Sequence, residues 1–177
     1  MNRRTCSALM FLLLLASPLH AQGIKQKIKT FRNSKRFIVK YDKFKNRTWV
    51  SVWFATGSKF GGALSGEVSF QGEEPEGKAD YFFALASYSR SWRFLDESDR
   101  ELYAIIDGER MRLGIGDRDS SIMPGASVRE DITFKLDAET FAKIANSKSV
   151  ELKVGLIEFK LKDEHQEAFR DLISLTK

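Results

Sequence analysis

The chain has 177 residues, of which 42% are hydrophobic and 30% are charged, and its formal net charge is +5. These values fit a single domain of ordinary globular composition, and they exclude low-complexity disorder and a collagen-like repeat. A multi-span membrane protein is excluded because the sequence contains only one long uncharged run. No chemical activity follows from the sequence alone.

The first residues have the three-part layout of a secretory signal peptide. Arg3 and Arg4 precede an apolar run over residues 8–16, and Leu19 and Ala21 occupy the two positions that a signal peptidase recognises. The apolar run is shorter than the roughly 20 residues that span a bilayer. We therefore predict a signal peptide over 1–21 with cleavage after Ala21, a secreted or periplasmic bacterial protein, and no transmembrane span after cleavage. An uncleaved anchor is the alternative.

Cysteine and histidine usage limits the chemistry of the mature chain. The only cysteine, Cys6, lies inside the predicted signal peptide, so disulfides, thiolate metal sites and cysteine nucleophiles are excluded. His165 is the only histidine beyond the predicted cleavage site, which excludes a histidine cluster for a metal. We expect no metal site and no cofactor, and we expect His165 in the first turn of the last helix.

Basic residues are concentrated directly after the signal peptide. Residues 24–47 contain ten basic residues and one acid, Asp42, which gives this segment a net charge of +9. The segment either binds a polyanion, such as anionic lipid or a cell-wall polymer, or is solvated and pairs with acids of the body. A nucleic-acid partner is not favoured. The polyanion-binding candidates are Lys25, Lys27, Lys29, Arg32, Lys35, Arg36, Lys40, Lys43, Lys45 and Arg47.

Residues 22–35 are predicted to form a basic N-terminal leader, and residues 36–177 a single α+β domain. In the leader, Ile24, Ile28 and Phe31 have helical spacing, which is consistent with a short amphipathic turn.

The body begins with segments typical of strands. Residues 64–70 and 128–136 alternate between apolar and polar residues, as a strand with one buried face does. Three further segments are apolar and β-prone on both sides: residues 36–41, 48–55 and 80–88, the last of which we expect to be central.

Turn residues divide the second half of the body. Asp107-Gly108 lies between two apolar runs and predicts a two-residue hairpin turn. Residues 116–125, which end in Pro124-Gly125, are predicted as a loop.

The C-terminal third contains an internal similarity. Residues 132–139 and 157–164 are identical at five of eight positions, and each copy is predicted as a strand that leads into a helix. The copies either place two equivalent helices on one sheet or are similar by chance. The predicted fold class is α+β, mainly antiparallel β-sheet with two C-terminal helices packed on one face.

Three tryptophans, Trp49, Trp53 and Trp92, are candidates for an aromatic binding surface, although core packing is the simpler interpretation. Trp49 and Trp53 share one face of their predicted strand. The residue content favours a non-catalytic binding or interaction module of the cell envelope, whose partner is an unknown envelope protein or an anionic polymer. The alternatives are a polyanion-binding protein acting through residues 24–47 and an envelope hydrolase using carboxylates or His165. No catalytic residue is nominated, and enzymatic activity is left open.

Overall fold

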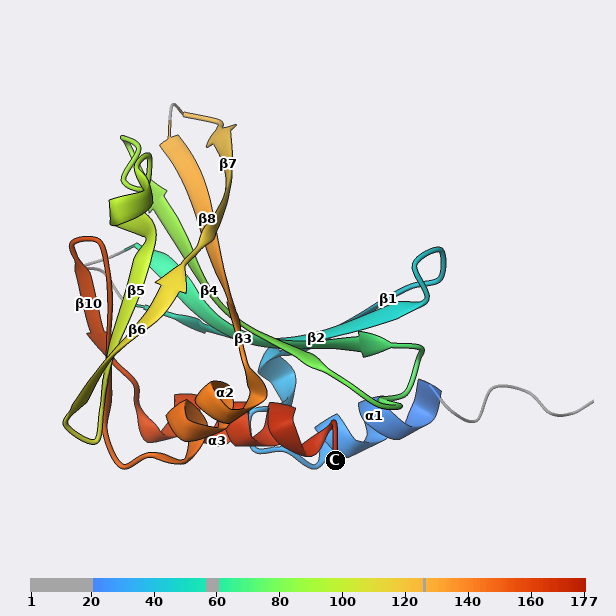
Figure 1. The fold of residues 1–177 in the computed structure, drawn as a ribbon. Coiled ribbons are helices and arrows are strands. Elements are labelled where there is room, and N and C mark those ends of the chain that lie inside the picture. The colour runs from blue at the N-terminus through green and yellow to red at the C-terminus, as the bar shows by residue number, and fades with distance from the viewer. Residues whose placement is uncertain (1–20, 57–60, 126) are drawn as a thin grey trace, which may run out of the picture.

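The structure of the protein is a computed structural model, which describes residues 21–56, 61–125 and 127–177. Within these ranges ten strands form two antiparallel sheets, and two of the three α-helices lie near the C-terminus (Figure 1). The predicted α+β class is therefore confirmed, although the strands form two sheets instead of one. The predicted signal peptide over 1–21 and its cleavage after Ala21 lie outside the described residues, apart from Ala21 itself.

The larger sheet, called the large sheet below, contains six of the described strands. Their order across the sheet is β1 (Phe37–Asp42), β2 (Arg47–Ala55), β3 (Gly62–Gln71), β4 (Asp80–Ser89), β8 (Ser127–Leu136) and β7 (Asp117–Met123). The small sheet contains four, in the order β10 (Ile157–Lys160), β9 (Val150–Val154), β5 (Glu101–Ile106) and β6 (Glu109–Ile115). The helical elements are α1 (Ala21–Lys29), η1 (Ser34–Arg36), η2 (Glu97–Arg100), α2 (Ala138–Asn146) and α3 (Asp163–Ser174).

The hairpin prediction at Asp107-Gly108 is confirmed, and the loop prediction for 116–125 is wrong. Asp107 and Gly108 both have positive φ, 51° and 89°, and join β5 to β6. Most of 116–125 forms strand β7, which pairs with β8 from Asp117↔Thr133 to Met123↔Ser127. Serine, aspartate and proline there favour a loop by composition, but the backbone partner offered by β8 decides the structure.

Both copies of the internal similarity are strands followed by helices, as predicted. The first copy is β8 and α2, and the second is β10 and α3. The two strands belong to different sheets, so the copies do not share one sheet. Asp137 caps α2 by accepting a hydrogen bond from the backbone N–H of Thr140 at 2.7 Å, and this bond lowers the pKa of the Asp137 carboxyl.

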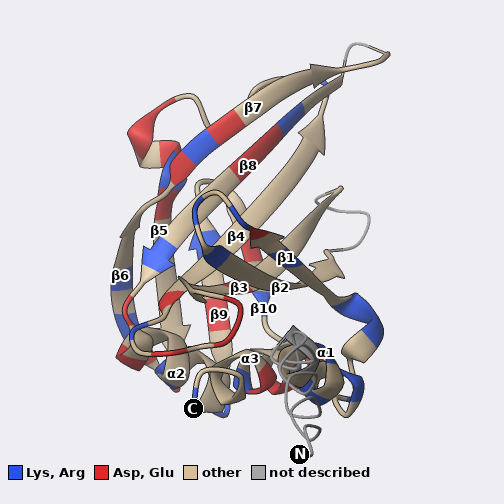
Figure 2. Cartoon of the chain, turned by 90° about the vertical axis from the view of Figure 1, so that its right-hand side faces the viewer, with Lys and Arg blue, Asp and Glu red and all other residues tan. Residues whose placement is uncertain are grey.

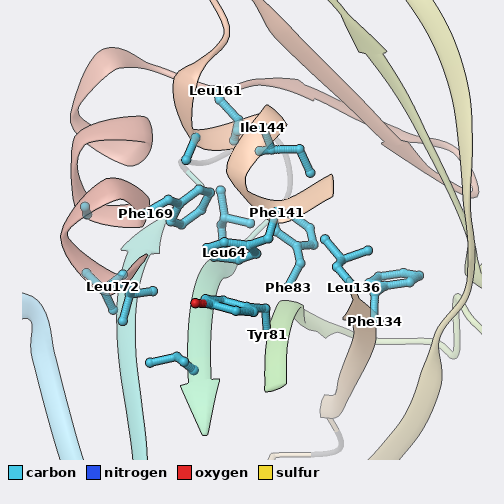
Figure 3. Close-up of a cluster of buried hydrophobic side chains, with 14 of the residues drawn as sticks. Leu64, Tyr81, Phe83, Phe134, Leu136, Phe141, Ile144, Leu161, Phe169 and Leu172 are labelled. Carbon is cyan, nitrogen blue, oxygen red and sulfur yellow. The ribbon is translucent and has the colours of Figure 1, made fainter. Parts of the chain in front are cut away.

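The core lies between the large sheet, the small sheet and the C-terminal helices (Figure 3). Phe169 of α3 contacts the ring of Phe141 of α2, with ring centroids 5.5 Å apart, and the edge of Phe83 of β4 at 6.5 Å. Gly66 of β3 leaves the space that the Phe169 ring occupies, since a Cβ there would lie 2.6 Å from that ring. The sheet therefore accepts α3 at close range because this strand position carries no side chain.

The basic leader is attached to the body. Ile24 and Ile28 of α1 are buried in the core cluster, which agrees with their helical spacing. Arg32 of the leader and Arg36, the first residue after it, form ion pairs with Glu167 and Glu164 of α3, at 3.4 Å and 3.9 Å. At least these two basic residues pair with acids of the body.

None of the helices in the described part of the chain is long and apolar enough to cross a membrane.

Candidate functional site

The face of the large sheet that points away from the helices, called the open face below, is the candidate site. On β2, Val50, Val52 and Phe54 are buried beneath the sheet, so the alternate residues Trp49 and Trp53 lie on the other side. No described helix or strand covers this side (Figure 1). The open face is therefore an uncovered sheet surface that carries two tryptophans.

Register extends the aromatic surface across the sheet. Ile38 pairs with Ser51 between Trp49 and Trp53, and Phe82 and Tyr88 of β4 have the same orientation two strands further on. Trp53 is 46% exposed, and Ile38 and Tyr88 are exposed to a similar degree. Trp49 and Phe82 are half-buried. Large apolar side chains that remain this accessible on a folded domain indicate an interaction surface when they lie together.

Small and hydroxylated residues lie between these aromatic side chains. Register places Ser51, Ser65, Ala84 and Thr133 on the open face, on four successive strands. Short side chains leave the aromatic rings accessible from the side, and the hydroxyls can donate or accept hydrogen bonds. The surface therefore offers both apolar and polar contacts to a partner.

A charged network crosses one end of the open face. The Arg47 guanidinium donates hydrogen bonds to Ser69 Oγ, at 3.1 Å from Nε, and to the Asp80 carboxylate. Asp80 also forms an ion pair with Lys135, whose Nζ lies 2.9 Å from Oδ1. These four residues come from β2, β3, β4 and β8. Hydrogen bonds from Lys135 and then from Arg47 hold the pKa of the Asp80 carboxyl below its ordinary value, so this carboxylate stays charged.

A second group of charges lies on β7 and β8, which both carry acidic and basic residues (Figure 2). Arg129 Nε is 2.7 Å from Asp131 Oδ2, and its guanidinium lies over the Tyr88 ring at 5.7 Å. The hydrogen bond to Asp131 raises the pKa of Arg129. The aromatic surface is thus bordered by charges of both signs, which does not favour a uniformly charged polymer as its ligand.

Glu67 lies near the centre of the open face, opposite Ser51 and Phe82. Ser65 Oγ donates to its carboxylate at 3.2 Å. Partial burial raises the pKa of the Glu67 carboxyl despite this bond, and the negative charge of Asp131 adds to the increase.

The Glu67→Gln variant should be more stable than the wild type at pH 8, and the difference should disappear near pH 4. A carboxyl whose pKa is raised by folding holds its proton more tightly in the folded state, so its ionisation opposes folding as the pH rises. Gln keeps the shape but cannot ionise. Thermal unfolding of both proteins between pH 4 and pH 8 measures the difference, with Glu73→Gln, at an exposed turn position, as the control. A difference independent of pH would contradict this interpretation.

Trp92 does not join Trp49 and Trp53. Its ring lies over the guanidinium of Arg118 at 4.9 Å. Arg118 is on the inner side of β7, where it contacts the buried Glu130 at 3.0 Å. Of the three predicted aromatic-surface candidates, the structure therefore brings two together on the open face and places the third on the opposite side of the sheet.

The ten basic candidates are distributed over several elements at one end of the molecule. Lys40 and Arg47 project from the open face, and Lys43 and Lys45 lie in the turn between β1 and β2. The others lie on α1, on η1 or between them: Lys25, Lys27, Lys29, Arg32, Lys35 and Arg36. Arg47, Arg32 and Arg36 are paired with acids, as described above.

His165 is a structural residue of the first turn of α3, where it was predicted. Its Nδ1 accepts a hydrogen bond from the backbone N–H of Lys162 at 3.2 Å, and its ring packs against Phe54 with centroids 4.5 Å apart. Burial lowers the pKa of the imidazole. His165 therefore belongs to the N-terminal cap of α3, and its ring faces Phe54 instead of a nucleophilic side chain.

Two of the hollows on the surface of the described residues lie away from the centre of the open face. One, of about 340 Å³, is lined by Asn46, Gln71, Gly72, Glu73, Glu74 and Glu76. The other, of about 450 Å³, lies over the outer side of the small sheet, around Tyr103 and Ile105. Across 21–56, 61–125 and 127–177, no group of three His, Cys, Asp or Glu side chains is arranged to hold a metal ion.

Comparison with known proteins gives no match to a family model, to a curated protein or to a solved structure.

The sequence analysis missed Glu67, Asp80, Phe82 and Tyr88 as residues of the candidate site. The alternation around Glu67 shows that it lies on the exposed side of a strand, but only the order of the strands places it between the two tryptophans and β4.

Proposed function

We propose that this protein is a non-catalytic, exported binding module of the bacterial cell envelope, and that it binds a partner protein on the open face. The observation that carries the proposal is the group of large apolar side chains on an uncovered side of the large sheet, formed by the aromatic residues Trp49, Trp53, Phe82 and Tyr88 together with Ile38. The location rests on the predicted signal peptide.

The composition of the open face favours a protein over other ligands. The aromatic residues of β2 and β4 lie on both sides of Glu67, and charges of both signs lie at the ends of the face. Aromatic residues are enriched in protein–protein interfaces, and the rims of these interfaces are polar. Trp53 and Arg129 belong to the residue types that dominate binding energy there. Arg47, Lys135 and Arg129 are paired with Asp80 and Asp131, so the open face offers a polyanion no group of unpaired positive charges at these positions.

The hydrolase alternative has less support. The acid-lined hollow takes its three glutamates from one turn, Glu73 to Glu76, on one side of the space. Hydrolysis of a glycosidic bond needs carboxyls on both sides of the bond that breaks. His165 is occupied in the α3 cap.

The test uses an envelope extract of the organism that makes the protein. Proteins captured by the immobilised wild type are identified by mass spectrometry, then purified, and their dissociation constants are measured by calorimetry. We expect Trp53→Ala to weaken binding about thirtyfold, as loss of a central tryptophan does. Tyr103→Ala, at an exposed aromatic residue of the small sheet, should bind like the wild type.

Unfolding temperatures of both variants show whether they remain folded. Capture of no protein, equal binding by Trp53→Ala and the wild type, or capture of a glycan in place of a protein would each contradict the proposal.

A further inference from the structure

The turn between β1 and β2 displays a phenylalanine to solvent. Phe44 is 90% exposed, whereas Phe54, Phe70 and Phe83 of the neighbouring strands are fully buried. The hairpin carries this turn away from the helices, to the outer edge of the molecule (Figure 1). An aromatic side chain held in water at a projecting tip gains free energy from any apolar environment that accepts it.

The exposure of Phe44 is fixed by the turn itself. Asp42 Oδ1 accepts hydrogen bonds from the backbone N–H groups of Phe44, at 2.9 Å, and Lys45, at 3.2 Å. Asn46 has a positive φ of 45°, and its side-chain oxygen accepts the Tyr41 hydroxyl at 2.9 Å. The turn is therefore a built structure that holds Phe44 outward, so little ordering is needed when the tip meets a partner.

Lysines flank Phe44 in the turn and in the strand before it. Lys43 Nζ lies 5.1 Å from the centre of the Phe44 ring, Lys45 is the next residue in the turn, and Lys40 lies on β1. The ion pairs found among the described residues involve none of these three lysines. Figure 2 shows basic residues on the hairpin and on α1, and acidic residues on the turn between β3 and β4.

We propose that the β1–β2 tip, residues 43–45 with Lys40, is a docking element for an anionic lipid bilayer. Phe44 enters the interface between headgroups and acyl chains, and the lysines contact the headgroup phosphates. A cell-wall polymer or a nucleic acid would also attract the lysines, but it offers Phe44 no hydrocarbon. A bilayer offers both, because apolar burial and attraction to anionic headgroups act together at its surface.

The acidic turn between β3 and β4 restricts how the protein docks. Glu73, Glu74 and Glu76 lie around a hollow that Asn46, at the end of the tip, also lines. These carboxylates oppose close approach of the whole end of the molecule to an anionic surface. The tip therefore inserts alone and shallowly. Glu73→Gln, which removes one of these negative charges, should strengthen binding to anionic vesicles. This inference does not depend on the partner proposed for the open face.

The test measures co-sedimentation with vesicles of equal parts phosphatidylglycerol and phosphatidylcholine, and with phosphatidylcholine alone. Wild type and variants are compared in the same processed form, with the amino terminus read by mass spectrometry. We expect binding to the anionic vesicles, about tenfold weaker for Phe44→Ser. Lys43→Gln and Lys45→Gln should each weaken it about fivefold. High salt should reduce the contribution of the lysines.

Two control variants are matched to these changes. Leu156→Ser removes another almost fully exposed apolar side chain, from the turn between β9 and β10, and Lys148→Gln removes an exposed lysine far from the tip in the chain. Both should bind like the wild type. Phe44→Trp should add tryptophan fluorescence that lipids with brominated acyl chains quench.

The outcomes separate the possible partners. Weaker binding of the lysine variants with unchanged binding of Phe44→Ser would show that the tip recognises a polyanion without an apolar part, and the lipid proposal would be wrong. The same conclusion follows if the wild type does not bind anionic vesicles, or if Leu156→Ser weakens binding as much as Phe44→Ser.

Discussion

Phe169→Ala is expected to lower the free energy of unfolding by about 3–5 kcal/mol, the range found for phenylalanines truncated inside cores. The Phe169 ring is completely buried, and it joins α3 to Phe141 of α2 and to Phe83 of the large sheet. Its removal leaves a cavity that Gly66, directly beneath it, cannot fill. Urea-induced unfolding, followed by circular dichroism, measures the loss.

The chain supplies a matched control for this substitution. Phe44→Ala makes the same chemical change at a side chain that is 90% exposed, so the free energy of unfolding should change by no more than about 0.5 kcal/mol. A loss below about 1 kcal/mol for Phe169→Ala would show that α3 does not pack on the sheet as described.

A double-mutant cycle tests the contact between Phe169 and Gly66 directly. Gly66→Ala alone should destabilise the protein by about 1–3 kcal/mol, because the new Cβ meets the Phe169 ring. In the Phe169→Ala background the same substitution should cost less, since the ring is absent. Additive losses would contradict the contact.

Glu130→Leu is expected to lower the free energy of unfolding by about 3–5 kcal/mol, as breaking a buried ion pair does. Glu130 is fully buried on β8. Its carboxylate accepts the backbone N–H groups of Arg93, at 2.7 Å, and Phe94, at 3.2 Å, and it contacts Arg118 Nε at 3.0 Å. Leu leaves these donors without the carboxylate and Arg118 without its charged partner.

Replacing both charges distinguishes the cost of an unpaired charge from the cost of lost packing. Glu130→Leu combined with Arg118→Met should be more stable than Glu130→Leu alone, because no uncompensated charge remains. Hydrogen exchange should increase at Arg93 and Phe94 in both variants, since the carboxylate holds that loop. Unchanged exchange at these two amides would contradict the role assigned to Glu130.

The local features of the fold could be predicted from sequence, and its long-range pairing could not. Asp107-Gly108 specifies its own turn, and the alternation over 128–136 specifies β8, because both signals lie in neighbouring residues. The sheet to which each strand belongs depends on partners far along the chain. Residues 117–123 became β7 through pairing with β8, which their own composition does not indicate.

The same limit applies to the candidate site. Period-two alternation correctly placed Trp49 and Trp53 on one face of β2. Asp80 belongs to the candidate site because β2, β3, β4 and β8 lie side by side in the sheet. This strand order brings Arg47 and Lys135 into contact with its carboxylate. At the hairpin tip the sequence drew attention to Lys43 and Lys45, whereas the display of Phe44 depends on the geometry of the turn.

The order of the elements along the chain has a consequence for the rate of folding. Phe169 and Leu172 of α3 complete the cover over β3, where both approach Gly66, and α3 follows all ten described strands in the sequence. The contact between Phe169 and Gly66 therefore joins residues about a hundred positions apart, and contacts of this kind carry a loop-closure cost that is met before they stabilise the fold. We expect the protein to fold more slowly than a helical bundle of the same length.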